Sequence, residues 1–119
     1  MLWIRLGGIF MLLAVALGAF GAHGLRHALD PDARAIYQTA VFYHAIHGLG
    51  LMLLGVVSLL RPGAQVLRCA GWAFTAGIIL FSGSLYLLSV TGIKRLGMVT
   101  PFGGVAFLAG WLWLALAAR

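Results

Sequence analysis

Four stretches of this 119-residue chain contain no charged side chain, and they comprise residues 6–25, 35–60, 69–93 and 96–118. Each is long enough to cross a bilayer, because a helix needs about 20 apolar residues to do so. In lipid the backbone polar groups must be satisfied within the protein, so such stretches are helices or strands of a closed barrel. They lack the alternation of polar and apolar residues that barrel strands show. The sequence therefore predicts an all-α polytopic membrane protein with four transmembrane helices in a compact bundle.

Prolines, glycines and charged residues predict where these helices begin and end. Asp30 before Pro31 is typical of a helix N-cap followed by the first helical residue, and Thr100 before Pro101 has the same form. We expect residues 24–29 to form a short interfacial helix. The first apolar run is longer than a signal-peptide core, so we expect it to be a retained helix. The expected spans, within a single domain over residues 1–119, are 4–25, 33–60, 68–91 and 100–118.

The composition excludes a soluble domain and a disordered chain. Hydrophobic residues make up 63% of the sequence and charged residues 8%, whereas soluble domains carry about 25% charge and disordered chains carry more. The net charge is +6, but the basic residues are scattered singly between apolar runs. They cannot form a nucleic-acid-binding face, so we expect membrane lipids and not nucleic acid as partners.

The distribution of basic residues gives little information about orientation. Four basic residues, all of them arginines, lie on the side of the termini. Four more lie on the other side, and these are Arg26, Arg34, Lys94 and Arg95. Positive residues mark the cytoplasmic side, so this tied count also permits insertion in both orientations. The terminal amine tips the balance, and we expect a multi-pass protein with both termini in the cytoplasm.

Small residues recur at a spacing of four on three of the predicted helices. Such residues let helix backbones approach closely in lipid, either within one bundle or between subunits. We expect a homo-oligomer as well, because four short helices leave much packing surface exposed. The small residues are Ala14, Gly18 and Ala22 in the first span, Ala73 and Gly77 in the third, and Ala106 and Gly110 in the fourth.

The four tryptophans fall towards the side of the termini. They are Trp3, Trp72, Trp111 and Trp113. Tryptophan is enriched at membrane–water interfaces. We therefore interpret these residues as an interfacial belt.

Polar side chains concentrate in the half of the membrane opposite the termini, and polar groups in a membrane interior usually face the bundle. Residues spaced by three or four share a helix face, so we expect a polar pocket there. His47 in this pocket is expected to be neutral, donating one hydrogen bond and accepting another. Hydrogen bonding between helices without any ligand remains an alternative role for these residues. The candidate ligand-pocket residues are His23, Thr39, Tyr43, His47, Ser82, Ser84, Tyr86 and Thr100.

The chain lacks the motifs of the common enzyme classes. It contains no nucleophile elbow, phosphate-binding loop or HExxH motif, so we expect no catalytic residues and a non-enzymatic protein. Four histidines make a haem or metal site an alternative. No acidic residue lies within a span to complete such a site, and Cys69 is isolated on the other side, so we expect no metal and no cofactor. A further alternative is a pore or transporter for small solutes, which would have to be oligomeric.

Four motifs, in order along nearly the whole chain, resemble those of the YgdD-like small membrane proteins, a family of uncharacterised function (domain of unknown function 423). The resemblance implies a four-helix integral protein of the bacterial inner membrane, and it implies no reaction. The motif residues are Gly18 to Gly24; Tyr37, Thr39, Tyr43 and His47; Phe81 to Tyr86; and Thr100 to Gly104 with Phe107, Gly110 and Trp111. Our interpretation is a small inner-membrane protein whose pocket binds a lipid or another small amphipathic molecule.

Overall fold

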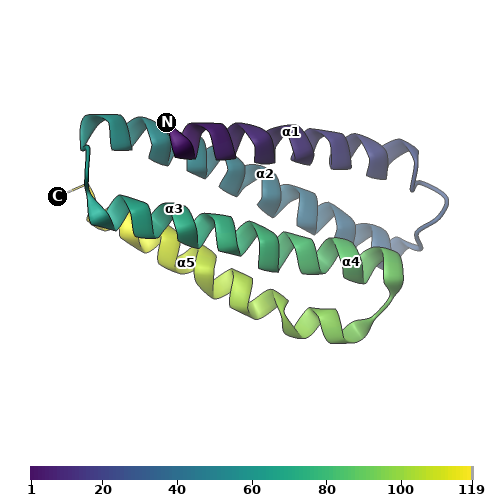
Figure 1. Ribbon diagram of the computed structural model, residues 1–119. Coiled ribbons are helices and arrows are strands. Elements are labelled where there is room, and N and C mark those ends of the chain that lie inside the picture. Colours follow the sequence, from purple (N-terminus) through teal and green to yellow (C-terminus); the bar gives the residue numbers. More distant parts are fainter. Residues whose placement is uncertain (119) are drawn as a thin grey trace.

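The computed structural model describes residues 1–118, and its four long helices confirm the predicted fold class (Figure 1). The third is one continuous rod with a π-helical segment in its middle, and the fourth follows a 3₁₀ segment. All four are long and apolar enough to cross a membrane. The elements are α1 (Leu2–His23), α2 (Pro31–Leu60), α3 (Gln65–Gly77), the π segment (Ile78–Ser82), α4 (Gly83–Thr91), the 3₁₀ segment (Lys94–Met98) and α5 (Thr100–Leu116).

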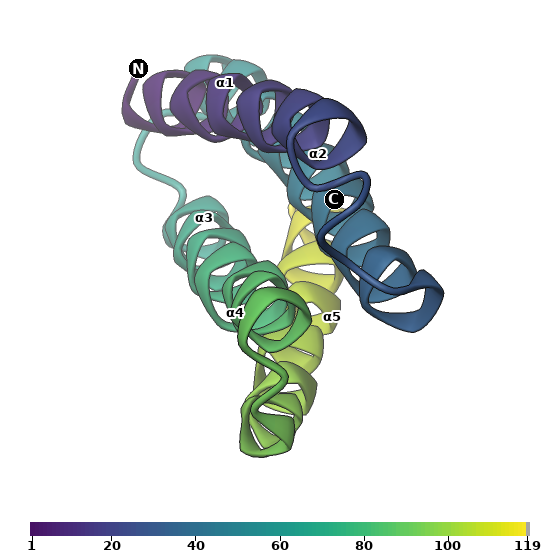
Figure 2. The ribbon, with the colours of Figure 1, turned by 90° about the vertical axis from the view of Figure 1, so that its right-hand side faces the viewer.

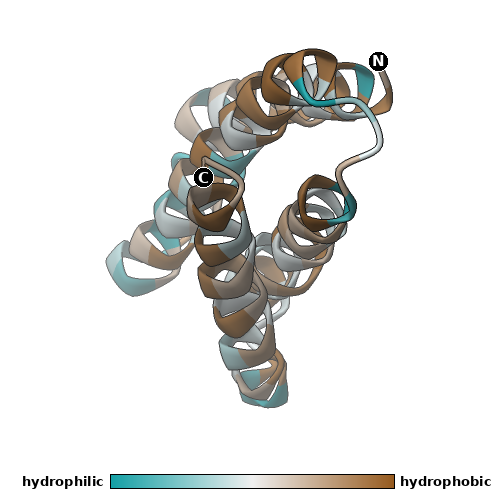
Figure 3. Cartoon of the chain, turned by 90° about the vertical axis from the view of Figure 1, so that its left-hand side faces the viewer, coloured by the Kyte–Doolittle hydropathy of each residue, from teal (hydrophilic) through white to brown (hydrophobic). Residues whose placement is uncertain are grey.

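The helices are arranged as two antiparallel pairs. α1 packs along α2, and the rod of α3, the π segment and α4 packs along α5. Both termini lie at one end of the molecule, and the α1–α2 and α4–α5 connections lie at the other (Figure 1). Seen end-on, the pairs diverge from each other (Figure 2). Apolar residues cover much of the length of the rods (Figure 3), as lipid contact requires.

Of the two helix N-caps predicted from the sequence, the structure confirms the one at Asp30 but not the one at Thr100. Asp30 is the N-cap of α2, and its carboxylate accepts a hydrogen bond from the Ala33 N–H at 2.7 Å. Thr100 makes no capping bond, so the cap predicted there is wrong. Its hydroxyl is instead 2.6 Å from the Ser84 hydroxyl on α4. Tertiary packing thus overrides the local capping preference of this threonine.

The connection between α1 and α2 consists of turns, so the interfacial helix expected at residues 24–29 is wrong. Its backbone bonds are local, for example from the Ala28 N–H to the Leu25 carbonyl at 3.1 Å. Helix nucleation is costly for so few residues. The Arg34 guanidinium binds the Arg26 carbonyl at 2.7 Å, and this bond holds the connection against α2.

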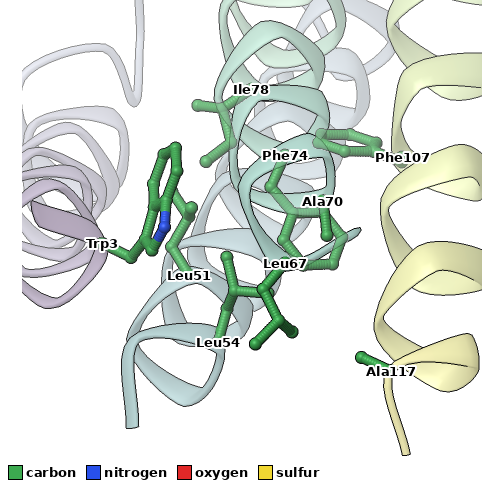
Figure 4. Packing of buried hydrophobic residues seen from close by; sticks show 9 residues of the cluster. All are labelled: Trp3, Leu51, Leu54, Leu67, Ala70, Phe74, Ile78, Phe107 and Ala117. Atoms are coloured by element: carbon green, nitrogen blue, oxygen red, sulfur yellow. The ribbon is translucent and has the colours of Figure 1, made fainter. Parts of the chain in front are cut away.

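The apolar core lies between all four rods, towards the end that carries the termini (Figure 4). Trp3 is only 7% exposed, so the interpretation as an interfacial belt is wrong for this residue. Its indole lies directly over Gly71 of α3, and the missing side chain there makes room for it. The core residues are Trp3, Leu51, Leu54, Leu67, Ala70, Phe74, Ile78, Phe107 and Ala117.

Small residues let α3 and α5 interlock through phenylalanine rings. Phe107 of α5 lies against Gly77, and Phe74 of α3 lies against Gly110. A Cβ atom added at Gly110 would lie 2.6 Å from the Phe74 ring. These two small residues therefore pack within the chain, as close helix approach in lipid requires. Ala73 and Ala106 are half-buried.

Of the three small residues singled out on α1, Gly18 faces α2. An added Cβ at Gly18 would lie 3.3 Å from the Val41 side chain of α2. Ala14 is buried, whereas Ala22 is exposed at the end of the helix. Because α1 and α2 are joined by a short connection, each is the other's nearest available surface.

Candidate functional site

Both ring nitrogens of His47 are hydrogen-bonded within the protein. Its Nδ1 lies 2.7 Å from the Tyr43 carbonyl, and the Trp111 indole N–H donates to its Nε2 at 3.0 Å. A carbonyl only accepts and an indole N–H only donates, so these bonds need the neutral imidazole with its proton on Nδ1. The ring also stacks on Phe107, with centroids 3.5 Å apart. His47 therefore joins α2 to α5 and leaves no ring nitrogen for a ligand.

A cavity of about 690 Å³ opens beside this histidine. Ligand pockets span about 300–1,000 Å³ and are mainly apolar and aromatic, as this one is. We call it the α2–α5 groove. Its lining residues are Phe42, Tyr43, Ile46, His47, Phe81, Pro101, Gly104, Val105, Phe107, Leu108 and Trp111.

The Tyr43 hydroxyl is the uncommitted polar group of this groove. The side chain is 37% exposed, and its ring packs on Phe81 with centroids 4.6 Å apart. The hydroxyl has no hydrogen-bond partner among residues 1–118. A phenol in this position can donate one hydrogen bond and accept others. The groove therefore combines an apolar, aromatic wall with a free polar contact.

The π segment shapes the wall that carries Phe81. The Gly83 N–H bonds the Ile78 carbonyl five residues earlier, which widens this turn. The Ser82 hydroxyl, fully buried, donates to the Ala40 carbonyl of α2 at 2.8 Å. π segments occur often at functional sites. Nothing in the apolar pattern of residues 69–93 predicts this one.

Tyr86 pairs with His44 and not with His47. The Tyr86 hydroxyl lies 2.9 Å from Nδ1 of His44, which is only 4% exposed. The Nε2 atom of His44 is buried and has no hydrogen-bond partner among the described residues. Tyr37 completes this cluster, because its ring packs on Tyr86 and its hydroxyl donates to the Leu17 carbonyl of α1 at 2.5 Å. The cluster joins α1, α2 and α4.

Three further candidate residues bond to the protein itself. Ser84 bonds both the Phe81 carbonyl, at 2.9 Å, and the hydroxyl of Thr100. Thr39 is exposed, and its hydroxyl bonds the Ala35 carbonyl one turn earlier at 3.0 Å. These hydroxyls therefore satisfy backbone groups or join α4 to α5.

The eight candidates do not meet in one cavity. Tyr43 and His47 line the α2–α5 groove. His23 is exposed and lines a separate cavity at the α1–α2 connection. The remaining five line neither cavity; they are Thr39, Ser82, Ser84, Tyr86 and Thr100.

The second cavity, which we call the α1–α2 groove, has a volume of about 560 Å³. It lies on the other side of Phe42, which lines both cavities. Arg26 and Arg34 are its charged lining residues, and sequence analysis did not single them out. Its residues are Gly18, Gly21, Ala22, His23, Arg26, Leu29, Arg34, Tyr37, Gln38, Val41 and Phe42.

The residues that sequence analysis missed near His47 come from distant parts of the chain. Trp111 lies 64 positions from its partner His47, and the belt interpretation placed its indole at the membrane surface. Phe107 lines the same groove and stacks on that histidine. The four-residue spacing from Phe107 to Trp111 was the available signal, because it places both rings on one face of α5.

The histidines do not assemble a metal site in the part of the chain that the structure describes. No group of three or more His, Cys, Asp or Glu side chains lies close enough together there to hold an ion. The two ring nitrogens of His47 are already occupied, and Nδ1 of His44 is paired with Tyr86. A metal at His47 would have to break these contacts.

Comparison with known proteins gives the family. Residues 17–104 match the model of a family described as "Protein of unknown function (DUF423)". This chain belongs to that family. The resemblance seen in the sequence motifs is thereby confirmed.

Several bacterial relatives are similar over nearly their whole length. The UPF0382 membrane protein YwdK of Bacillus subtilis is 48% identical over 116 residues, which cover 98% of this chain and 94% of the relative. A UPF0382 membrane protein of Staphylococcus haemolyticus is 43% identical, with 98% and 93% covered. No solved structure matches the chain. This chain is therefore a bacterial-type membrane protein of an uncharacterised family.

Proposed function

We propose that this protein is a non-enzymatic component of the bacterial inner (plasma) membrane that holds a small amphipathic molecule in the α2–α5 groove. The ligand has an apolar body and a carbonyl or hydroxyl group, as a lipid or a quinone does. The uncommitted Tyr43 hydroxyl in an aromatic groove of about 690 Å³ is the observation that carries the proposal.

The tyrosine, more than the apolar wall, gives the groove its selectivity. Phe81, Phe107 and Leu108 contact the apolar body of the ligand. This contact favours the ligand only weakly over an acyl chain of the bilayer, because lipid is itself apolar. A hydrogen bond from Tyr43 is therefore the term that distinguishes a ligand with an acceptor from an ordinary acyl chain. A net hydrogen bond of about 1 kcal/mol corresponds to about a fivefold change in affinity.

His47 keeps the groove in shape in this proposal. Its bonds to the Tyr43 carbonyl and to Trp111 fix α2 against α5. The ring stacked on Phe107 forms the floor of the groove. Substituting His47 would therefore disturb both packing and binding, so it is a poor test of binding alone.

Gly104→Leu and Tyr43→Phe test the proposal more directly. A Cβ atom at Gly104 would lie 3.8 Å from the Phe81 ring, an ordinary contact, so leucine there occupies the groove without displacing backbone. Tyr43→Phe removes only the free hydroxyl. Gly8→Leu is the matched control, since nothing lies within 4 Å of a Cβ added at Gly8.

Native mass spectrometry in detergent measures retention of added monoolein, a neutral single-chain lipid, and of decylubiquinone. We expect Gly104→Leu to abolish retention of one or both probes, Tyr43→Phe to reduce it about fivefold, and Gly8→Leu to leave it unchanged. Retention in Gly104→Leu equal to that of the unmodified protein would refute the groove as the site.

The proposal places both termini in the cytoplasm and includes self-association. Two spans have sides free for self-association, because only 17% of the apolar stretch is buried within the chain in α1 and in the span Lys94–Leu116, compared with 44% in α2. Lipid or a second copy has to cover these sides.

A further inference from the structure

We infer that the α1–α2 groove is a second site, which binds the phosphate of an anionic phospholipid. It lies at the end of α1, which ends at His23 after 22 helical residues. A helix of this length spans the hydrocarbon core of about 30 Å. The groove therefore lies at the level of the head groups, and its ligand differs in charge and position from that of the α2–α5 groove.

The charge of the groove favours an anion. Its charged lining residues are Arg26 and Arg34, and no acidic side chain is among the residues that line it. The nearest acid in the sequence, Asp30, is committed to the N-terminus of α2, where it accepts from the Ala33 N–H at 2.7 Å. Asp32 is exposed in the first turn of α2, where an acid stabilises the helix dipole.

Arg26 has the free donors that a phosphate needs. Its side chain is exposed and has no hydrogen-bond or ion-pair partner among residues 1–118. Arg34 has a different role, because its Nη2 donates to the carbonyls of Arg26 and Leu29, at 2.7 and 3.5 Å. Arg34 thus holds the connection in the position from which Arg26 reaches the groove. Guanidinium groups bind phosphate oxygens with two parallel hydrogen bonds.

The floor of the groove suits an acyl chain. Val41, Phe42 and Leu29 supply apolar surface, and Ala22 lines the floor with a small side chain. Phe42 is 59% exposed. A phospholipid joins its phosphate to acyl chains and can therefore use both the charged rim and the apolar floor, whereas free phosphate uses only the charged rim. The combination of rim and floor therefore favours a membrane lipid.

The test uses the full chain in detergent, titrated with phosphatidylglycerol and with phosphatidylcholine of the same acyl chains, and lipid retention is measured by native mass spectrometry. Arg26→Gln removes the free guanidinium and should lower phosphatidylglycerol retention about fivefold. Arg95→Gln is the matched control, since Arg95 is exposed, lies on the same side of the membrane and lines neither groove. We expect it to leave retention unchanged.

A steric variant and a soluble anion complete the design. Ala22→Phe fills the floor without changing charge, and we expect it to lower retention of phosphatidylglycerol as well. Inorganic phosphate at equal concentration should not displace the lipid. Equal retention of the two lipids, equal losses in Arg26→Gln and Arg95→Gln, or displacement by inorganic phosphate would each overturn the inference. None of these outcomes depends on Tyr43 or Gly104, so the proposed function is tested separately.

Discussion

Gly103 and Gly104 are adjacent in α5, yet we expect their replacement by alanine to change the stability of the protein in opposite directions. A Cβ atom added at Gly103 would lie 2.7 Å from the Phe81 Cα atom, and it would also collide with the Phe81 backbone nitrogen. A Cβ atom added at Gly104 meets nothing closer than the Phe81 ring at 3.8 Å. Backbone cannot rotate away as a side chain can, so Gly103→Ala forces α5 away from the π segment.

The two substitutions share their intrinsic effect on the helix, so their difference isolates the packing term. Replacing glycine by alanine in a helix favours folding by about 1 kcal/mol. Overpacking a close contact costs about 1–3 kcal/mol, and a collision with backbone lies at the upper end of that range. We therefore expect Gly104→Ala to raise the free energy of unfolding by up to about 1 kcal/mol and Gly103→Ala to lower it by about 2 kcal/mol.

Reversible unfolding in mixed micelles, with increasing SDS and helix content followed by circular dichroism, measures this difference. We expect the two variants to differ by about 3 kcal/mol, the full packing term. Equal stabilities, or a Gly103→Ala protein at least as stable as Gly104→Ala, would refute the close approach of α5 to Phe81. The π segment would then not have the position described.

Three further predictions concern the polar cluster, the topology and assembly. Tyr86→Phe breaks the bond to buried His44 and should lower the free energy of unfolding by about 1–2 kcal/mol. Tyr43→Phe removes a hydroxyl without a partner and should change this free energy by less than about 0.5 kcal/mol. Equal effects of the two variants in the same SDS titration would contradict the pairing of Tyr86 with His44. We place both termini in the cytoplasm. In a Cys69→Ser background, Leu2→Cys and Ala118→Cys should therefore both be shielded from a membrane-impermeant thiol reagent added to intact cells. Labelling of both cysteines from outside would reverse the topology, and half-labelling of both would indicate dual orientation. Analytical ultracentrifugation should give an oligomer that depends on the protein-to-detergent ratio, and a monomer at every ratio would exclude self-association.

The sequence alone determined the four helices and the side on which their polar residues lie. A bilayer core offers no water to the backbone, so uncharged runs of this length have to be helical, and lone acids and prolines such as Asp30 and Pro31 start them where water is available. Both results depend only on residues close together in the chain. The motifs around Gly21, Tyr43 and Phe81 likewise identified the family.

Tertiary structure decided which polar groups meet. His44 and His47 are three positions apart on one helix, yet His44 faces Tyr86 of α4 and His47 faces Trp111 of α5. Helical periodicity describes the faces of a single helix, but it does not say which neighbour covers each face or at what depth. That depends on how closely the backbones approach, which Gly77, Gly103 and Gly110 set. The polar residues expected in a single pocket are therefore divided, and the structure has two grooves that share only Phe42 in their linings.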